Sequence, residues 1–294
     1  MTRYLLRHAT AYSYDDEVSA SYGRAHLLPR DQPGQRVLQA SLTVTPTPAE
    51  EGEHADFFGN RSSYFAVRQA HTALEVVSRA TLQIERRPVE AATLDSLSWE
   101  LARDALTPND SARQYLLPSR QVRIVRPVVQ YAQAVFTPRR PFGEAIMALT
   151  SRIFHDFEYK AGSTTVRSTL ADVLQKRSGV CQDFAHLAVG CLRAVGLAGR
   201  YVSGYLETLP PPGQPKLQGA DASHAWASVL LPGHGWIDLD PTNDQFVDHR
   251  YLVLAHGRDY SDVPPLKGVI MTDAKSSIMT VSVDVTPLPD PPTP

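Results

Sequence analysis

The sequence SGVCQDFAHLAVGCLRAVG, residues 178–196, decides how the second half of the chain folds. Its apolar side chains recur at steps of three and four, which predicts a helix from Cys181 to about Val195 with one buried stripe. That stripe consists of Phe184, Leu187, Ala188, Cys191, Leu192 and Val195. Gly196 then fits the position that ends a helix. Strand-like runs follow at 199–207, 224–232 and 236–241, so a helix followed by a mostly antiparallel sheet predicts an α+β fold.

The first part of the chain has the pattern of strands rather than helices. Apolar residues alternate with polar ones in the segments 37–46 and 74–85. Between them, Gly59-Asn60 separates two apolar runs, and both residue types tolerate the positive φ that a tight hairpin needs. Several short strands joined by turns predict an N-terminal antiparallel β-sandwich. The side chains expected on the buried faces are Leu38, Ala40, Leu42, Val44, Leu74, Val76, Ala80, Leu82 and Ile84.

Two helices are predicted between the strand-rich region and Cys181. Pro141 suits the first position of a helix with Ile146, Leu149 and Ile153 turned inward. Thr169 with Asp172 three residues later resembles a capping box, and Gly179 is expected to end that second helix.

The predicted domains follow from these patterns. Residues 1–90 form the β-rich domain, 91–140 a helical connector broken by prolines, 141–284 the α+β core, and 285–294 a flexible proline-rich tail.

Composition excludes several classes of partner. The chain has 294 residues, with 29 Lys and Arg against 31 Asp and Glu, and a formal charge of -2 offers no field for a nucleic acid or an anionic membrane. No run approaches the roughly 18 apolar residues of a membrane span. The N-terminal segment is too polar for a signal peptide, so the expected location is the cytoplasm. Two cysteines cannot form a disulfide framework, so each serves packing or chemistry.

The two cysteines differ in their predicted positions. Cys181 stands at the start of its helix, where unpaired backbone N–H groups and the helix dipole stabilise a thiolate. Cys191 lies on the apolar stripe, which favours core packing. From position alone, Cys181 could serve packing or nucleophilic catalysis equally well.

A nucleophilic thiol needs a base and an acceptor that orients the base. His224 opens an apolar strand, so its ring can face a cleft, although it could also be a solvent-exposed strand end. Asp238 and Asp240 share one face of the next strand, which a short hairpin would place beside His224. Periodicity does not choose between these two aspartates.

Three segments of the second half resemble the core of the bacterial transglutaminase-like superfamily. They are RSGVCQDFAHLAVGCLRAVGLAGRYVSGYL at 177–206, ASHAWASVLLPGHGWIDLDPTND at 222–244, and HGRDYSDVPPLKGV at 256–269. The shared pattern is Cys at a helix start, His-x-Trp on a strand, and Trp followed by Asp-Pro-Thr. RHATAYSYDDEV, HLLPRDQPGQ and DFFGN, all before residue 61, are similar to the β-rich domain that precedes this core in a group of bacterial proteins.

The resemblance implies a papain-like α+β core and a cysteine-dependent amide hydrolase or acyltransferase without cofactor or metal. The family's nucleophile falls on Cys181, its base on His224 and its acid on Asp240, the residue before Pro241-Thr242. The implied substrate is a peptide or protein amide, taken through a thioester. No residue is assigned to substrate binding, and the oligomeric state is open.

Several neighbouring residues have both a functional and a structural interpretation. The backbone N–H of Cys181 is a natural oxyanion donor, and Tyr159 is a candidate for a second donor, although a half-buried aromatic is favoured. Structural roles are favoured for the remaining candidates: Gln182, Asp183, His186, Trp226, Trp236, Arg258, Asp259 and Tyr260.

The sequence leaves three hypotheses about function. Within the enzyme hypothesis, intracellular hydrolysis is favoured over transamidation because no signal peptide is recognised. The alternative from another class is a non-catalytic peptide-binding module that retains the fold, although binding alone needs no matched acid, base and nucleophile. A metal site of Cys181, His186 and His224 lacks any recognised spacing.

Overall fold

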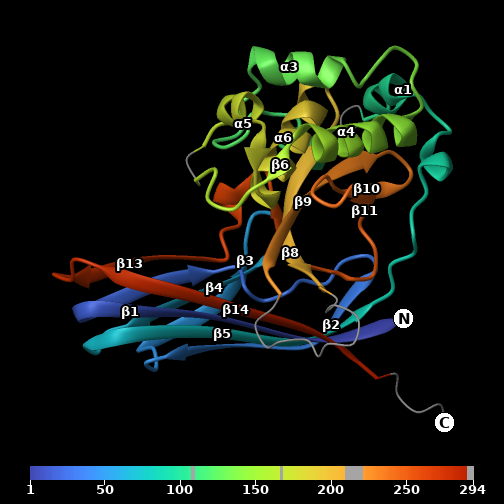
Figure 1. Ribbon diagram of the computed structural model, residues 1–294. Helices are drawn as coiled ribbons and strands as arrows, with labels where there is room; N and C mark the ends of the chain where they lie inside the picture. The colour runs from blue at the N-terminus through green and yellow to red at the C-terminus, as the bar shows by residue number, and fades with distance from the viewer. Residues whose placement is uncertain (107–109, 166–167, 209–220, 290–294) are drawn as a thin grey trace, which may run out of the picture.

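Two large antiparallel sheets, a two-stranded parallel sheet and a layer of helices make up the structure, a computed structural model that describes residues 1–106, 110–165, 168–208 and 221–289. In Figure 1 the first sheet lies below, the helices lie above, and the second sheet stands between them. None of the described helices is long and apolar enough to cross a membrane.

The first sheet contains seven strands in the order β2-β5-β1-β4-β3, with β13 and β14 also paired to β1. Buried side chains on β5 follow the predicted alternation, including Leu74, Val76 and Leu82. Leu38 on β2 departs from it and is exposed, because the register shifts between Val37 and Gln39. The strands are β1 (Thr2–Ala25), β2 (Gln35–Thr45), β3 (Glu50–Ala55), β4 (Arg61–Val67), β5 (His71–Ile84), β13 (Leu266–Thr272) and β14 (Ser277–Leu288).

The long strand β1 makes this sheet curl. Its first half pairs with β5 and β14, and its last residues pair with β4 and β13, with a register shift between Ser13 and Val18. All seven strands therefore belong to one continuous curled sheet, and the predicted two-sheet sandwich is not confirmed. The predicted hairpin joins β3 and β4 through residues 56–60, with Gly59 at φ 72°.

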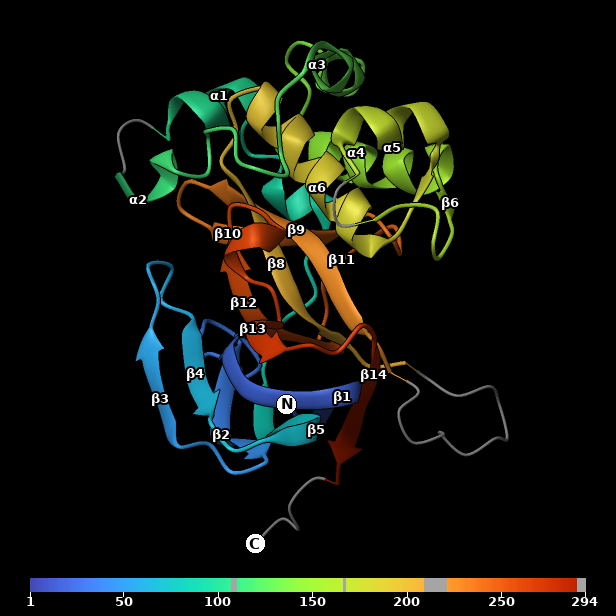
Figure 2. The same cartoon turned by 90° about the vertical axis from the view of Figure 1, so that its left-hand side faces the viewer.

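The C-terminal segment returns to the N-terminal sheet. Both β13 and β14 run antiparallel to β1, and Figure 2 shows β14 beside it. Since β14 extends to Leu288, residues 285–288 of the predicted tail lie in a strand, and residues 290–294 are outside the described part. Sequence alone did not indicate this pairing because its partners are more than 240 residues apart.

The second sheet has the order β11-β10-β9-β8-β12. Its strands are β8 (Gly199–Leu206), β9 (Ser223–Leu231), β10 (Gly235–Asp240), β11 (Gln245–Phe246) and β12 (Tyr251–Gly257). The short helix η2 (Tyr260–Asp262) follows β12. The remaining elements lie between β5 and β8 in the sequence: η1 (Ala91–Leu94), α1 (Trp99–Asp104), α2 (Asp110–Arg113), α3 (Arg126–Gln133), α4 (Phe142–Asp156), β6 (Glu158–Tyr159), α5 (Leu170–Lys176), β7 (Ser178–Gly179) and α6 (Cys181–Ala194).

Helix α6 lies at the centre of the helical layer. It contacts β8 and β9 on one side and α3, α4 and α5 on others. Its residues are therefore buried almost all round from Asp183 to Arg193, rather than along the one predicted stripe. Gly196 follows it at φ 85°, as expected for a residue that ends a helix.

The two preceding helices begin as the sequence predicts. Pro141 precedes α4, whose residues Ile146, Leu149 and Ile153 are fully buried. Thr169 and Asp172 form the capping box of α5. That helix ends at Lys176, and the residue that caps it is Arg177 at φ 52°, two positions before the expected Gly179.

Candidate active site

Cys181 is the first residue of α6, as predicted, and its side chain is half-buried. The local fold places it there because Val180, with an extended backbone, precedes the helix. The Asp183 carboxylate also accepts a hydrogen bond from the Val180 N–H at 2.9 Å, which fixes the entry into the helix. The first backbone N–H groups of any helix lack intrahelical partners, so they are available near this sulfur.

His224 and Asp240 lie in direct contact. The His224 Nε2 donates to Asp240 Oδ2 at 2.7 Å, from the second residue of β9 to the last residue of β10. Because Nε2 is engaged by the carboxylate, Nδ1 is the ring nitrogen left for another partner. Cys181 and His224 line the same cleft, and the charge of Cys181 acts on the His224 ring. The structure thus brings the three predicted site residues together.

Further hydrogen bonds hold the fully buried Asp240 carboxylate. Oδ2 accepts from Asn243 Nδ2 at 2.6 Å and from the Tyr251 hydroxyl at 2.6 Å, and Oδ1 accepts from the Thr242 N–H at 2.9 Å. A buried carboxylate with this many donors is stable as the anion. Neither Asn243 nor Tyr251 was singled out from the sequence, although Asn243 stands only three residues after Asp240.

These contacts set the charge of His224. Burial lowers its pKa, but the hydrogen bonds and charges of Asp240 and Cys181 outweigh burial and raise the pKa to about 10. Burial raises the pKa of Asp240, whereas its bonds to His224, Tyr251 and Asn243 have the larger combined effect and lower it. At neutral pH, the ring is therefore an imidazolium and the carboxylate is ionised.

Asp238 lies elsewhere. It is opposite Ser228 in the β9–β10 pairing, further from His224 along the strands than Asp240. It lines a second cavity, together with Arg200 and Trp236, that shares no residue with the one beside Cys181. The geometry therefore separates two aspartates that periodicity left equivalent.

A cleft of about 310 Å³ opens beside Cys181 and His224. One wall comes from α6 and the second sheet, and the other comes from β1, β13 and β14 of the first sheet. The lining from the first sheet was not foreseen, because it depends on long-range strand pairing. It includes His8, Thr10, Tyr12, Leu266, Met279 and Val281.

The two cysteines have different surroundings. Cys191 is fully buried among the apolar side chains between α6 and its neighbouring helices. Burial raises the pKa of its thiol. Its predicted packing role agrees with this position, whereas Cys181 lines the cleft.

Some of the residues close to Cys181 line the cleft and others do not. Gln182 lines the cleft. Asp183 is turned into the protein and accepts from the Thr164 hydroxyl at 2.6 Å as well as from Val180. Tyr159 is 58% exposed and is not part of the cleft lining, but burial and the charge of Cys181 both raise its pKa.

His186 is an uncharged ring that holds the Tyr260 segment in place through a hydrogen bond. Burial lowers its pKa to about 4, and its Nε2 accepts from the Tyr260 N–H at 3.1 Å. That bond fixes the segment that brings the Tyr260 ring into the cleft wall. The Asp259 carboxylate accepts from the N–H of Gln121 at 2.8 Å and of Ser261 at 2.8 Å. Arg258 forms an ion pair with Asp262 at the surface.

Two of the three tryptophans, Trp226 and Trp236, are structural anchors. Trp226 is fully buried and packs edge-on against Tyr251, with ring centroids 5.3 Å apart. Trp236 packs edge-on against Tyr115, 5.0 Å away, and lines the second cavity rather than the cleft.

Comparisons with known proteins identify the family and the fold of the chain. Residues 4–83 match the bacterial transglutaminase-like N-terminal region, and residues 129–241 match the transglutaminase-like superfamily. An uncharacterised protein of Mycobacterium tuberculosis is 46% identical over 97% of this chain and 93% of its own length. A protein-glutamine gamma-glutamyltransferase of Pseudomonas aeruginosa is 32% identical over 32% of this chain and 15% of that protein. The crystal structure of a candidate cysteine protease from Cytophaga hutchinsonii shares the fold, with a TM-score of 0.79 and 22% identity over 100% of this chain and 93% of that one.

Proposed function

The chain belongs to the transglutaminase-like superfamily, and on that premise we propose that it is a cysteine-dependent amide hydrolase or acyltransferase. One observation carries the proposal. His224 is bonded through Nε2 to the buried Asp240 at 2.7 Å, and it lines an open cleft together with Cys181. A nucleophile, a base and a group that orients the base are the parts that acyl transfer through a thioester requires.

The first step forms the thioester. Because a cation beside the sulfur stabilises a thiolate, the His224 imidazolium favours the reactive form of Cys181. The sulfur attacks the carbonyl carbon of the amide, and the carbonyl oxygen becomes an oxyanion. His224 Nδ1 then gives its proton to the leaving amine, the C–N bond breaks, and the acyl group stays on Cys181.

The oxyanion needs hydrogen-bond donors that already point at its position before the reaction. The N–H of Cys181 itself, at the first position of α6, is the donor that the helix geometry supports. The dipole of α6 adds partial positive charge at the same end.

The second step releases the acyl group. A water gives a proton to the neutral Nδ1 of His224 and attacks the carbonyl carbon of the thioester. The C–S bond breaks, Cys181 leaves as the thiolate, and the acyl group is released as a carboxylic acid. An amine in the same place yields a new amide instead. We propose hydrolysis as the main outcome, on a peptide or isopeptide-like amide, and the cytoplasm as its location.

The cleft supports an uncharged acyl group. No Asp, Glu, Lys or Arg contributes to the lining that the described residues provide. Tyr12, Tyr260, Leu266, Met279 and Val281 give it an apolar character. His8 lies in the wall as a neutral ring, because burial lowers its pKa to about 4.

The test compares wild type with Cys181→Ala on a peptide mixture, with and without a primary amine, and identifies products by mass. Hydrolysis products from wild type alone support the proposal, and amine-containing products would show transfer. Peptides that are retained by both proteins but never altered would instead support the non-catalytic binding module.

A further inference from the structure

A second cavity of about 480 Å³ lies apart from the cleft and shares no lining residue with it. It is enclosed by the segment that follows β1 and by the second sheet, around the start of β10. Its charged lining comprises three arginines (Arg30, Arg86 and Arg200) and two aspartates (Asp31 and Asp238). Positive groups are therefore in excess.

Two of these arginines meet at one neutral histidine. Arg30 Nη1 and Arg200 Nη1 each lie 3.4 Å from His256 Nε2. Since a guanidinium only donates, Nε2 is an acceptor and the proton is on Nδ1. Burial, together with the charges of Arg200 and Arg30, lowers the pKa of His256 to about 2, so it adds no positive charge.

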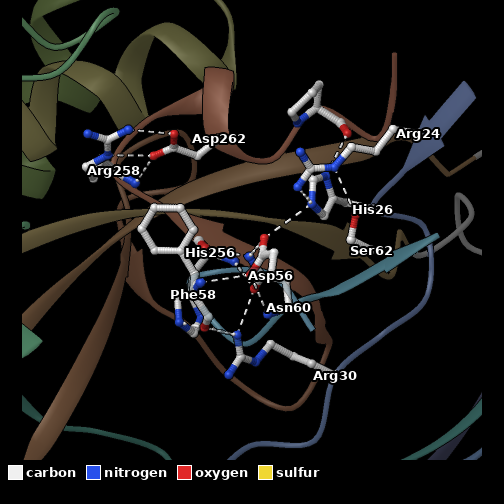
Figure 3. A network of polar contacts seen from close by, with 11 residues as sticks. Arg24, His26, Arg30, Asp56, Phe58, Asn60, Ser62, His256, Arg258 and Asp262 are labelled. Atoms are coloured by element: carbon white, nitrogen blue, oxygen red, sulfur yellow. Dashed lines mark hydrogen bonds and ion pairs between the residues drawn. The ribbon is translucent and has the colours of Figure 1, made fainter. Parts of the chain in front are cut away.

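The Arg30 side chain is held in place by the turn that joins β3 and β4. Its Nη1 donates to the Phe58 carbonyl at 3.0 Å and to Asn60 Oδ1 at 2.7 Å (Figure 3). Asn60 in turn donates to the His256 carbonyl at 2.9 Å. This network fixes Arg30 beside the cavity without giving it a carboxylate partner.

Arg200 is fixed by stacking. Its guanidinium lies 4.2 Å from the centre of the Trp236 ring, and the residue is only 8% exposed. No ion pair of Arg200 is found among the described residues, although the charge of Asp238 acts on it. Burial lowers the pKa of Arg200 to about 10, which is the sign of a cation short of compensating contacts.

Several buried polar atoms around the cavity have no hydrogen-bond partner in the described part of the chain. They are Arg30 Nε, Arg86 Nη2, Arg200 Nε, Asp238 Oδ1 and His256 Nδ1. Four of the five are donors. Buried polar atoms are nearly always satisfied in folded proteins, so this gathering of donors favours an acceptor in the cavity.

We propose that this cavity binds a small oxyanion, a carboxylate or a phosphate, between Arg30 and Arg200. Arginine donates in a planar fork that matches both groups, and a low-dielectric site strengthens each bond. Trp236 keeps the Arg200 fork oriented, and the turn at 56–60 does the same for Arg30. The site is independent of acyl transfer at Cys181.

The experiment titrates the full chain with inorganic phosphate and, separately, with acetate at constant ionic strength. Binding is followed by calorimetry and by the rise in Tm that a ligand specific for the folded state produces. Arg200→Gln should weaken binding by at least about tenfold, and Asp238→Asn should strengthen it by about tenfold, since it removes a repelling charge. Arg79→Gln, at an exposed position of β5, is the matched control and should bind as wild type does.

Opposite effects of Arg200→Gln and Asp238→Asn on the affinity support the site. The probe that binds more tightly, phosphate or acetate, identifies the class of oxyanion. Asp238→Asn carries the test alone if Arg200→Gln does not fold. The proposal is overturned if neither probe binds wild type. It is equally overturned if the probes bind wild type and Asp238→Asn alike, which indicates an adventitious ion only.

Discussion

Replacing Asp240 with Asn tests the proposed site most informatively, because it changes charge and hardly changes shape. The Thr242 N–H can still donate to the amide oxygen. The amide nitrogen, however, must then face three donors that now meet Oδ2: His224, Asn243 and Tyr251. The substitution therefore removes the anion that stabilises the imidazolium and leaves His224 without its acceptor.

The size of the effect follows from the pKa of His224. Its rise from 6.5 to about 10 corresponds to about 5 kcal/mol in favour of the protonated ring, and Asp240 and Cys181 share this stabilisation. If Asp240 provides half or more, the loss is roughly 2–5 kcal/mol, or about 30- to 5,000-fold in rate. A comparable loss of about 10⁴ follows the same exchange in a serine triad.

Alkylation of Cys181 by iodoacetamide provides an assay that needs no substrate. Wild type should react faster than a free peptide thiol at pH 6, and Asp240→Asn should react at close to the rate of the free thiol. Peptide mapping separates Cys181 from the buried Cys191, and Asp156→Asn, in a surface ion pair, controls for loss of one charge. Equal rates in wild type and Asp240→Asn would refute the reasoning, as would a loss in Asp238→Asn alone.

Three further predictions follow from the structure. Cys181→Ala should abolish turnover and keep the fold, and retained turnover would contradict the assignment of Cys181 as the nucleophile. Cys191→Ala should instead keep turnover and lower the free energy of unfolding by roughly 1–2 kcal/mol. Because the folded pKa of His224 is raised, its stabilising effect is complete below pH 6.5 and is lost as the pH rises through about 10. Urea unfolding of wild type and His224→Gln should therefore differ less at pH 10 than at pH 6, and a constant difference argues against the ion pair. Gly204→Ala should lose about 2–3 kcal/mol, since its Cβ would lie 2.1 Å from the Leu252 carbonyl oxygen; a Tm equal to that of wild type would be inconsistent with this packing.

Local patterns in the sequence predicted the elements that carry the site. The start of α6 at Cys181 and the strand that begins at His224 both follow from short-range signals, namely an apolar stripe and an apolar run. The choice of Asp240 over Asp238 came from family resemblance, because both aspartates lie on one face of β10. Only the pairing of β9 with β10 shows which of the two reaches His224.

Long-range pairing accounts for most of what the sequence did not predict. β13 and β14 join β1 across almost the whole chain, and they turn the expected sandwich into one curled sheet. The same pairing brings Met279 and Val281 into the cleft. No local periodicity contains this information, since an alternating strand does not specify which partner it pairs with.

The most direct test of the central claim is the detection of an acyl group on Cys181 itself. Wild type is mixed with the substrate peptides found above, quenched in acid within milliseconds to seconds, and mapped by mass spectrometry. An acyl adduct is expected on the peptide that contains Cys181, labile to hydroxylamine and missing in Cys181→Ala. Substrate turnover that proceeds without this adduct and continues in Cys181→Ala would contradict that claim.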